Sequence, residues 1–175
     1  VMVDLTVDRS NSVTAQEWDQ RTKLAAVYRA FARMGWDDLI YTHISARVPG
    51  PEAHFLINPF GLMYEEVTAS NLVKIDLAGE KVEADEPNEI NYAGYIIHSA
   101  VHEALENIHC VVHLHTDWGV AVASQKNGLL PLSQFNLFHY GGVAYHDYEG
   151  LALDADEKQR LVGDLGVHRM MVLRN

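Results

Sequence analysis

The run Cys110-Val-Val-His-Leu-His115 places two imidazoles, those of His113 and His115, at the end of an apolar stretch. Side chains alternate between the two faces of a strand, so both rings point the same way while Leu114 points to the opposite layer. The two Cα atoms are then about 6–7 Å apart, which lets both rings reach one divalent ion. The apolar residues before the pair predict a strand that is buried until its end. The alternative is a half-exposed strand whose histidines are satisfied by local hydrogen bonds, and the pair alone does not decide between the two.

Other histidines near this pair have spacings that do not complete the same site. In an extended strand, His109 lies about 13 Å from His113 and cannot share its ion. His98 and His102 are four residues apart, the spacing that puts two side chains on one face of a helix. Glu103 follows directly and does not form the helical zinc motif H-E-x-x-H. We therefore expect helix packing and surface positions for this second pair, without a second metal site.

The overall composition excludes several classes of protein. The chain has 175 residues, of which 48% are hydrophobic and 21% charged, as expected for one globular domain. Its 24 acidic and 13 basic residues give a formal charge of −11, which disfavours nucleic acid and anionic membranes as partners. No apolar stretch approaches the roughly 20 residues that span a bilayer, and the N-terminal sequence lacks the pattern of a signal peptide. The motifs of serine hydrolases, P-loop NTPases and Rossmann proteins are absent.

The single cysteine, Cys110, restricts the possibilities further. One cysteine excludes an internal disulfide and suits a reducing compartment, so we expect a cytoplasmic protein. Its position within a predicted strand also leaves the thiol inaccessible as a nucleophile. Catalysis by cysteine is therefore not expected.

Helical and extended patterns alternate along the chain. A capping box from Thr14 to Glu17 precedes apolar residues at helical spacing and predicts a helix over about 15–35. The other predicted helices cover about 91–106, 116–125 and 154–165, and predicted strands cover 110–115, 142–146 and 170–174. Two hairpins are predicted, one pairing 43–48 with 54–57 and the other pairing 72–76 with 80–83. This mixture of strands and helices in one short chain predicts a layered α/β sandwich.

Several motifs occur together in an order that is typical of one family. They are Ile97-His-Ser-Ala-Val-His102, Cys110-Val-Val-His-Leu-His-Thr116, Gly128-Leu-Leu-Pro131, Val143-Ala-Tyr-His-Asp-Tyr-Glu-Gly150 and Leu173-Arg-Asn175. From about residue 16 onward the chain resembles the class II aldolase/adducin head domain, and it is most similar to the adducin-like branch. The resemblance implies a three-layer α/β/α sandwich with a central mixed, largely antiparallel β-sheet. The domain would cover 15–175 after an N-terminal extension over 1–14, and it would lack the C-terminal portion of the family domain.

The resemblance also assigns a role to the two histidines. In aldolases and epimerases of this family, the histidines that match His113 and His115 bind a catalytic divalent metal, usually zinc, which polarises a substrate carbonyl. Catalytic zinc normally has three protein ligands. The third ligand histidine of the family falls just after the strand that ends at Asn175. His146 or His168 could replace it, although nothing in the sequence favours either.

One departure from the family pattern concerns proton transfer. The aldolases place an acid/base glutamate 19 positions before the first ligand, and the residue at that distance from His113 is Gly94. Glycine cannot transfer a proton, so the catalytic residue is left unassigned. Tyr95, Tyr145, His146 and a group from a neighbouring subunit remain open as alternatives.

A second departure concerns the substrate. Sugar-phosphate aldolases of the family hold the phosphate with small hydroxyl and glycine residues. The matching positions here are Thr42-His43, Phe60-Gly61 and Tyr92-Ala93. The aromatic residues among them are too bulky for a phosphate site, which argues against a sugar phosphate. His43, Asn58 and Asn91 are candidate polar contacts to a substrate, and local hydrogen bonds within turns are the alternative for each of them.

Two functions are compatible with these observations. The first is a divalent-metal-dependent lyase or epimerase, with zinc as the expected metal, acting on a small hydroxy-carbonyl compound. The second is a non-catalytic, adducin-like binding or scaffold module, which Gly94 favours. A scaffold has no physical need for two imidazoles that converge at a strand end, so the enzyme is the preferred hypothesis. In either case the resemblance implies a homo-oligomer, commonly a tetramer.

Overall fold

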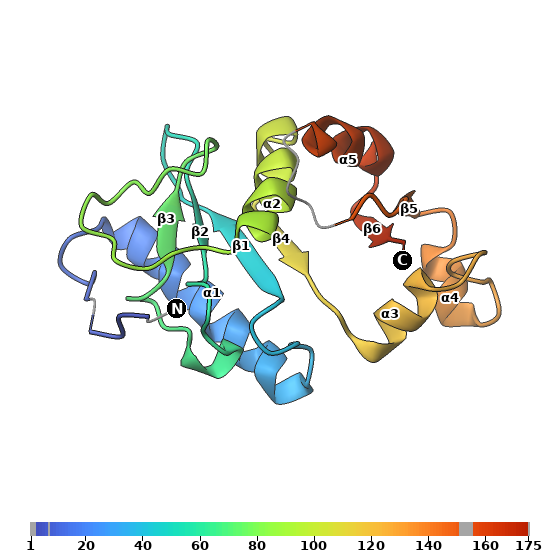
Figure 1. Ribbon diagram of the computed structural model, residues 1–175, viewed down its shortest axis with the longest axis horizontal. Helices are drawn as coiled ribbons and strands as arrows, with labels where there is room; N and C mark the ends of the chain where they lie inside the picture. Colours follow the sequence, from blue (N-terminus) through green and yellow to red (C-terminus); the bar gives the residue numbers. More distant parts are fainter. Residues whose placement is uncertain (1–2, 7, 151–155, 175) are drawn as a thin grey trace.

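The computed structural model describes residues 3–6, 8–150 and 156–174 (Figure 1). The helices are α1 (Ala15–Met34), the 3-10 helix η1 (Tyr64–Glu66), α2 (Tyr92–Ala104), α3 (Asp117–Ala123), α4 (Gln134–His139) and α5 (Glu157–Leu165). The strands are β1 (His43–Arg47), β2 (Phe55–Ile57), β3 (Val73–Ile75), β4 (Cys110–His113), β5 (Val143–His146) and β6 (Met170–Leu173).

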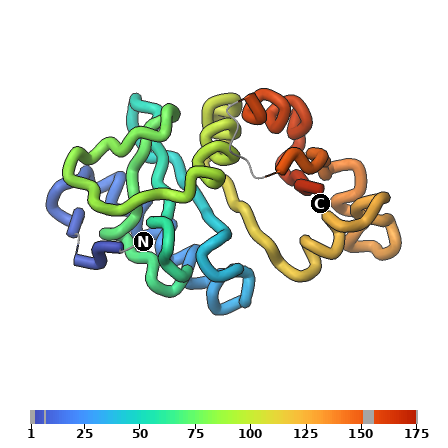
Figure 2. Tube along the Cα trace, in the orientation of Figure 1, coloured from blue at the N-terminus to red at the C-terminus, as the bar shows by residue number. Residues whose placement is uncertain are grey.

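The strands form two sheets with different pairing. The larger sheet has the order β3-β2-β1-β4 and is antiparallel throughout, whereas β5 and β6 form a parallel pair. Helix α2 lies between the two sheets, and the chain passes from β4 through a short link to α3 (Figures 1 and 2). The predicted α/β class with a central, largely antiparallel sheet is thus confirmed.

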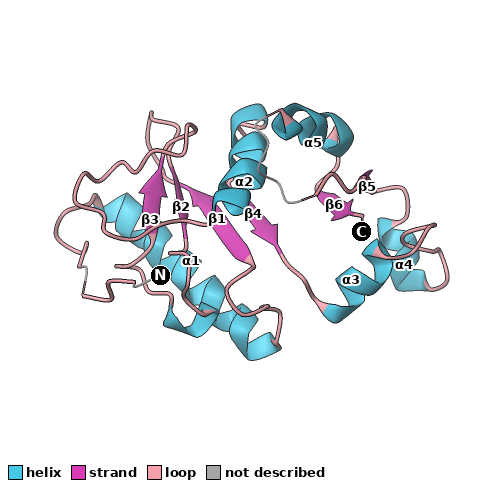
Figure 3. Cartoon of the chain, viewed as in Figure 1, coloured by secondary structure: helices cyan, strands magenta, loops and turns pink. Residues whose placement is uncertain are grey.

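Side chains of the larger sheet point alternately to its two faces, and each face packs against a different helix. Ile44 of β1 belongs to the apolar cluster that contains Leu24 and Tyr28 of α1. Phe55 of β2 belongs to a second cluster, which contains Ile96 of α2. Helices α1 and α2 therefore cover opposite faces of this sheet, which gives the predicted three layers (Figure 3).

Helix α1 begins and ends close to the residues that the local sequence predicts. The Thr14 side chain accepts a hydrogen bond from the Glu17 backbone N–H at 3.1 Å, so the predicted cap is present. The helix ends at Met34 because Gly35 adopts a left-handed conformation with φ of 66°, which glycine tolerates without strain. The predicted helix over about 15–35 is confirmed to within one residue.

Two other predictions need correction. The predicted strand over 80–83 forms only an isolated bridge between Ile75 and Lys81, because the Asp76 side chain accepts hydrogen bonds from the following turn. Residues 134–139, which were not expected to be helical, form α4 behind a Ser133 cap. The predicted helix over about 154–165 is confirmed over Glu157–Leu165, and residues 154 and 155 lie outside the described residues.

The expectation that β4 is buried was also wrong. Cys110 is exposed, and Val112 exposes 44% of its surface. The physical reason is that β4 pairs with β1 along one edge only, while its other side borders an open groove of about 520 Å³ toward β6. Apolar strand composition does not distinguish an edge strand from a central one. Cys110 is consequently an exposed residue, contrary to the prediction, although partial burial raises the pKa of its thiol.

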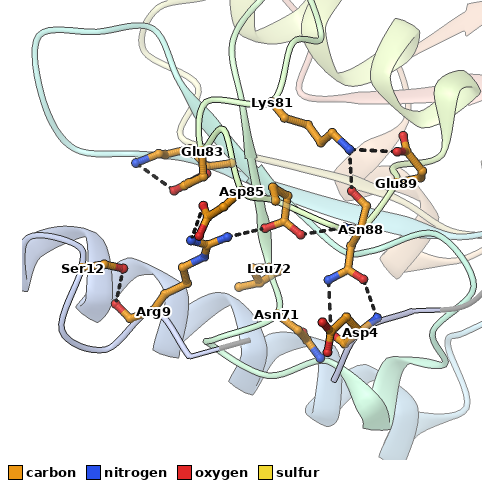
Figure 4. A network of polar contacts seen from close by, with 12 residues as sticks. Asp4, Arg9, Ser12, Asn71, Leu72, Lys81, Glu83, Asp85, Asn88 and Glu89 are labelled. Carbon is orange, nitrogen blue, oxygen red and sulfur yellow. Dashed lines mark hydrogen bonds and ion pairs between the residues drawn. The ribbon is translucent and has the colours of Figure 1, made fainter. Parts of the chain in front are cut away.

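The N-terminal segment packs on the acidic loop that precedes α2. The Asp4 backbone N–H donates to Asn88 Oδ1 at 2.7 Å, and the Asn88 side chain donates back to the Asp4 carbonyl (Figure 4). Arg9 forms ion pairs with Asp85 at 3.0 Å and with the buried Glu86 at 3.2 Å. These contacts neutralise part of the acidic loop. Among the described residues, no helix combines the length and the apolar character that crossing a bilayer requires.

One buried hydroxyl joins α1 to the strand that carries the candidate site. The Ile44 backbone N–H donates to Tyr28 Oη at 2.7 Å, and this hydroxyl donates to the Ile44 carbonyl at 2.5 Å or to Asn58 Oδ1 at 2.8 Å. The neighbouring Tyr64 is equally buried and meets the Tyr28 ring edge-on at 4.6 Å. Its hydroxyl, however, has no hydrogen-bond partner among the described residues.

We predict that Tyr28→Phe lowers the free energy of unfolding by about 1–3 kcal/mol, because it leaves buried polar partners unpaired. Tyr64→Phe is the matched control and should change the stability much less. Urea denaturation at neutral pH measures both. Equal losses in the two variants would show that the hydroxyl contacts of Tyr28 do not stabilise the fold.

Candidate metal centre

The register of the larger sheet brings histidines from distant parts of the chain together. His43, the first residue of β1, pairs directly with His113, the last residue of β4. Their rings stack with centroids 4.8 Å apart and planes inclined by only 12°. His115 lies two residues further, in the link between β4 and α3, where Thr116 caps the helix. The site thus sits where a strand ends and a helix begins.

The two predicted ligand histidines face each other. The Nε2 atoms of His113 and His115 are 2.8 Å apart, with the ring planes nearly perpendicular at 80°. On the other side of the second ring, His115 Nδ1 lies 2.9 Å from Asp38 Oδ2. A carboxylate at this position accepts the Nδ1 hydrogen and leaves Nε2 as a lone-pair donor. The two imidazoles therefore face each other within hydrogen-bond distance, and Asp38 orients one of them.

The electrostatics of the pair suit metal ligands. Burial, together with the nearby His115, lowers the pKa of His113 to about 4. His113 is consequently neutral at physiological pH, which is the state in which an imidazole can coordinate a cation. The two imidazoles fit a divalent ion as ligands once the ion replaces the hydrogen bond between their Nε2 atoms.

A third ligand is not assembled beside this pair. Among the described residues, no group of three or more His, Cys, Asp or Glu side chains is arranged to hold an ion. His146, one of the two open alternatives, lies on β5 in the other sheet, where its Nδ1 contacts Asp164 at 2.7 Å. His168, the other alternative, lies in the turn before β6. Neither joins His113 and His115.

Four buried residues behind the site form a structure that the sequence did not reveal. His43 Nδ1 lies 2.8 Å from His98 Nε2, His98 Nδ1 lies 2.6 Å from Ser45 Oγ, and Ser45 Oγ lies 2.8 Å from His102 Nε2. We call these four residues the histidine chain. None of the four exposes more than 3% of its surface, so the predicted surface position of His98 and His102 was wrong. The available signal was the alternation that puts His43 and Ser45 on one face of β1.

Burial keeps the rings of the histidine chain uncharged. Desolvation and neighbouring histidines lower the pKa values of His43 and His98 well below the usual range. Desolvation and the Arg47 charge lower the pKa of His102 to about 4. At neutral pH each ring therefore has one N–H donor and one acceptor nitrogen.

Gly94 makes room for the first ring of the histidine chain. A Cβ atom at this position of α2 would lie 2.8 Å from His43 Cδ2 and 2.9 Å from His43 Nε2. Real Cβ atoms essentially never approach another atom so closely. The family resemblance predicts an acid/base side chain at position 94. The His43 ring fills the space that such a side chain would need.

The other candidate substrate contacts have local hydrogen bonds. Asn58 is buried, accepts from Tyr28 and donates to the Pro59 carbonyl. Asn91 caps α2 by accepting from the Gly94 backbone N–H at 3.3 Å. Each carboxamide therefore has a local partner in the fold.

Two tyrosines considered for proton transfer lie in other parts of the molecule. The Tyr95 hydroxyl donates to the Leu77 carbonyl and accepts from Lys158. The Tyr145 hydroxyl accepts from the Leu129 backbone N–H at 2.9 Å. Neither hydroxyl has a contact with the two facing imidazoles.

Comparison with known proteins shows the family to which this chain belongs. Residues 22–175 match the family described as the Class II Aldolase and Adducin N-terminal domain. An aldolase II superfamily protein from Pseudomonas syringae has a crystal structure that covers 94% of this chain and 66% of its own, with 56% identity and a TM-score of 0.90. An L-fuculose 1-phosphate aldolase from Glaciozyma antarctica is 28% identical, with a TM-score of 0.79 over 92% of this chain and 62% of its own. The chain belongs to the class II aldolase and adducin family.

Relatives in this family include both bacterial proteins and adducins. Alpha-adducin of Mus musculus is 48% identical over 157 residues, which are 89% of this chain and 21% of that protein. The chain spans 66% of the length of a Caulobacter vibrioides relative and 65% of a Pseudomonas aeruginosa relative, at 54% and 57% identity. Part of each relative therefore lies outside the shared region.

We predict that Gly94→Ala destabilises the fold by about 1–3 kcal/mol, because the new methyl group overpacks the buried His43 ring. Gly163→Ala, at a helical glycine of α5 with nothing within 4 Å of the added Cβ, is the control. That control should be stabilised by roughly 0.5–1 kcal/mol through helix propensity. Thermal unfolding of both variants measures the difference, and a stable Gly94→Ala protein would contradict the close approach.

The lowered pKa of His102 predicts a specific pH dependence of stability. Between pH 6.5 and about 4 the unfolded chain binds a proton at this residue that the folded chain does not bind. The free energy of unfolding should therefore fall as the pH is lowered through this window, and it should fall less steeply in His102→Gln. Urea denaturation at pH 7.5 and pH 5 measures the slopes. His109→Gln, at an exposed position, should keep the wild-type slope, and identical slopes in all three proteins would contradict the assignment.

Proposed function

We propose that the protein is a divalent-metal-dependent lyase of the aldolase type, or an epimerase, that acts on a small hydroxy-carbonyl compound. The observation that carries this proposal is the 2.8 Å approach of the Nε2 atoms of His113 and His115. Membership of the class II aldolase and adducin family supports the reaction class. The Asp38 contact supports a ligand role for His115, because metal-binding histidines almost always donate their other N–H to such a partner.

His113 and His115 would hold the ion, and zinc suits their imidazole nitrogens. When bound, such an ion acts as a Lewis acid that polarises a substrate carbonyl oxygen. The remaining coordination positions would be available to substrate, water or a group from a neighbouring subunit. We propose a homo-oligomer, with a tetramer favoured by the family resemblance, and a cytoplasmic location.

The residues at the positions that match the family's phosphate site support a small substrate without phosphate. Phe60 and Tyr92 add aromatic bulk at positions where the resemblance predicts small phosphate-binding residues. His43 is a proposed substrate contact because it stacks on His113. Asn58 and Asn91 are also proposed as polar contacts, although each has a local hydrogen bond in the fold. The residue that transfers the proton is left unassigned, because Gly94 has no side chain.

A non-catalytic binding or scaffold module is the second candidate. Two observations favour it, namely the 48% identity to alpha-adducin and the absence of a side chain at Gly94. The two candidates differ in their need for a metal. A scaffold should fold and assemble without an ion, whereas the proposed enzyme loses its activity when the ion is removed.

Metal analysis of variants tests the proposal. In equilibrium dialysis against a fixed concentration of zinc, wild-type protein should bind more zinc than His113→Ala, because the variant keeps only one imidazole of the pair. His109→Ala is the control, since this exposed histidine is near in sequence but outside the site. Elemental analysis of the three proteins gives the result.

Turnover separates the enzyme from the scaffold. Zinc-loaded wild-type protein and His109→Ala should cleave or epimerise at least one compound in a panel of hydroxy-aldehydes and hydroxy-ketones, and His113→Ala should not. Equal zinc content in wild type and His113→Ala would overturn the metal site. Zinc binding without any turnover, together with binding of an actin filament in cosedimentation, would favour the scaffold.

A further inference from the structure

One residue in the loop between α1 and β1 has a strained backbone. Leu39 has a φ of 49°, and among the described residues it is the only residue other than glycine with a positive φ. The left-handed region disfavours every residue with a Cβ atom, and a bulky leucine is a clear outlier there. Strain of this kind persists only where the surrounding structure imposes it, and such residues cluster at functional sites.

The packing of the Leu39 side chain does not account for this conformation. Leu39 exposes 58% of its surface, so the burial of apolar area contributes little at this position. Glycine or asparagine would adopt the same backbone with less strain. The feature that needs an explanation is therefore the conformation of the backbone.

The strained residue lies in a turn that begins at the proposed metal centre. The Tyr41 backbone N–H donates to the Asp38 carbonyl at 2.9 Å and closes a four-residue turn with Leu39 in second place. A positive φ at the second residue defines the primed turn types. The first residue of the turn is Asp38, whose Oδ2 lies 2.9 Å from His115 Nδ1. Leu39 thus directly follows the residue that orients a proposed ligand.

Three contacts hold Asp38 in place. Its carbonyl accepts from Tyr41, and its backbone N–H donates to Oγ1 of the buried Thr42 at 3.3 Å. Its carboxylate contacts His115. The positive φ at Leu39 allows the chain to turn back to Thr42 while the carboxylate still points to His115.

The segment before the turn is held as well. The Trp36 backbone N–H donates to the Phe31 carbonyl at 3.0 Å, and the two aromatic rings meet edge-on with centroids 5.2 Å apart. One residue, Asp37, separates Trp36 from Asp38. Contacts on both sides of the turn therefore impose its conformation, which explains why the strain at Leu39 persists.

We propose that Leu39 is a positioning residue of the metal centre, because its left-handed backbone closes the turn that holds the Asp38 carboxylate against His115 before an ion binds. This inference rests on the proposed function, since it concerns the same site. A carboxylate that is already in place fixes the ring orientation of His115, so less conformational freedom is lost when the ion is bound. Leu39 has no ligand atom in its side chain and acts through Asp38.

Two substitutions at position 39 separate the backbone conformation from the loss of the leucine side chain. Leu39→Asn introduces a residue that visits the left-handed region readily, whereas Leu39→Val introduces a β-branched residue that strongly disfavours it. Both variants lack the leucine side chain. Asp38→Ala removes the carboxylate and is the reference for complete loss of its contact with His115.

Amide hydrogen exchange of the metal-free proteins measures the turn. The Tyr41 amide should exchange faster in Leu39→Val than in wild type, because this amide donates the hydrogen bond that closes the turn. Leu39→Asn should keep the wild-type rate. Equal rates in all three proteins, or equally fast exchange in both variants, would overturn the role assigned to the Leu39 backbone.

Zinc dissociation constants, measured by competition with a chromophoric chelator, connect the turn to the metal centre. Asp38→Ala should weaken zinc binding by about tenfold or more, as expected when the partner of a ligand histidine is removed. Leu39→Val should weaken it in the same direction, and Leu39→Asn should bind zinc as wild type does. The double variant Asp38→Ala/Leu39→Val should bind no more weakly than Asp38→Ala, because Leu39 acts through Asp38. Additive losses in the double variant would contradict this dependence.

The two measurements distinguish this inference from the proposed function. Wild-type protein that binds no zinc would contradict the proposed metal site, and the exchange rate of the Tyr41 amide would still decide whether Leu39 closes the turn. Wild-type zinc affinity in Leu39→Val, together with faster exchange at Tyr41, would overturn only this inference.

Discussion

The close approach of α2 to the larger sheet is the constraint on which the site depends. Because Gly94 has no side chain, the His43 ring can lie between the helix and the end of β4. This position lets one ring stack on His113 and bond to His98 at the same time. The antiparallel register of β1 and β4 supplies the other half of the constraint, since it sets His43 opposite His113. The position of helix α2, the strand register and the lack of a side chain at Gly94 thus together determine where the His43 ring lies.

Burial then determines the protonation state of the His43, His98, His102 and His113 rings. A charged imidazole in an apolar interior has no water to solvate it, so the neutral form is favoured. For the facing pair, neutrality means that a cation can replace the hydrogen bond between the two Nε2 atoms. For the rings behind them, neutrality means that each ring must donate through one nitrogen and accept through the other. The same desolvation therefore favours the neutral form both in the facing pair and in the rings behind it.

The features that local patterns determine were predictable from the sequence. Strand alternation predicted that His113 and His115 converge, although His115 lies in the link beyond β4. The capping box at Thr14 and the glycine at position 35 predicted α1. The features that depend on distant segments were not predictable. The contact between Asp38 and His115 spans 77 residues, and that between Ser45 and His102 spans 57, so neither has a local signal. The exposure of β4 was missed for a related reason, because the composition of a strand does not reveal how many neighbours it has.

A crystal structure of the zinc-soaked protein, with anomalous data collected at the zinc absorption edge, tests the central claim most directly. The account predicts one strong anomalous peak between the two facing rings, at about 2.0–2.1 Å from the Nε2 atoms of both His113 and His115. Zinc bound elsewhere, with the two rings still hydrogen-bonded to each other, would contradict it.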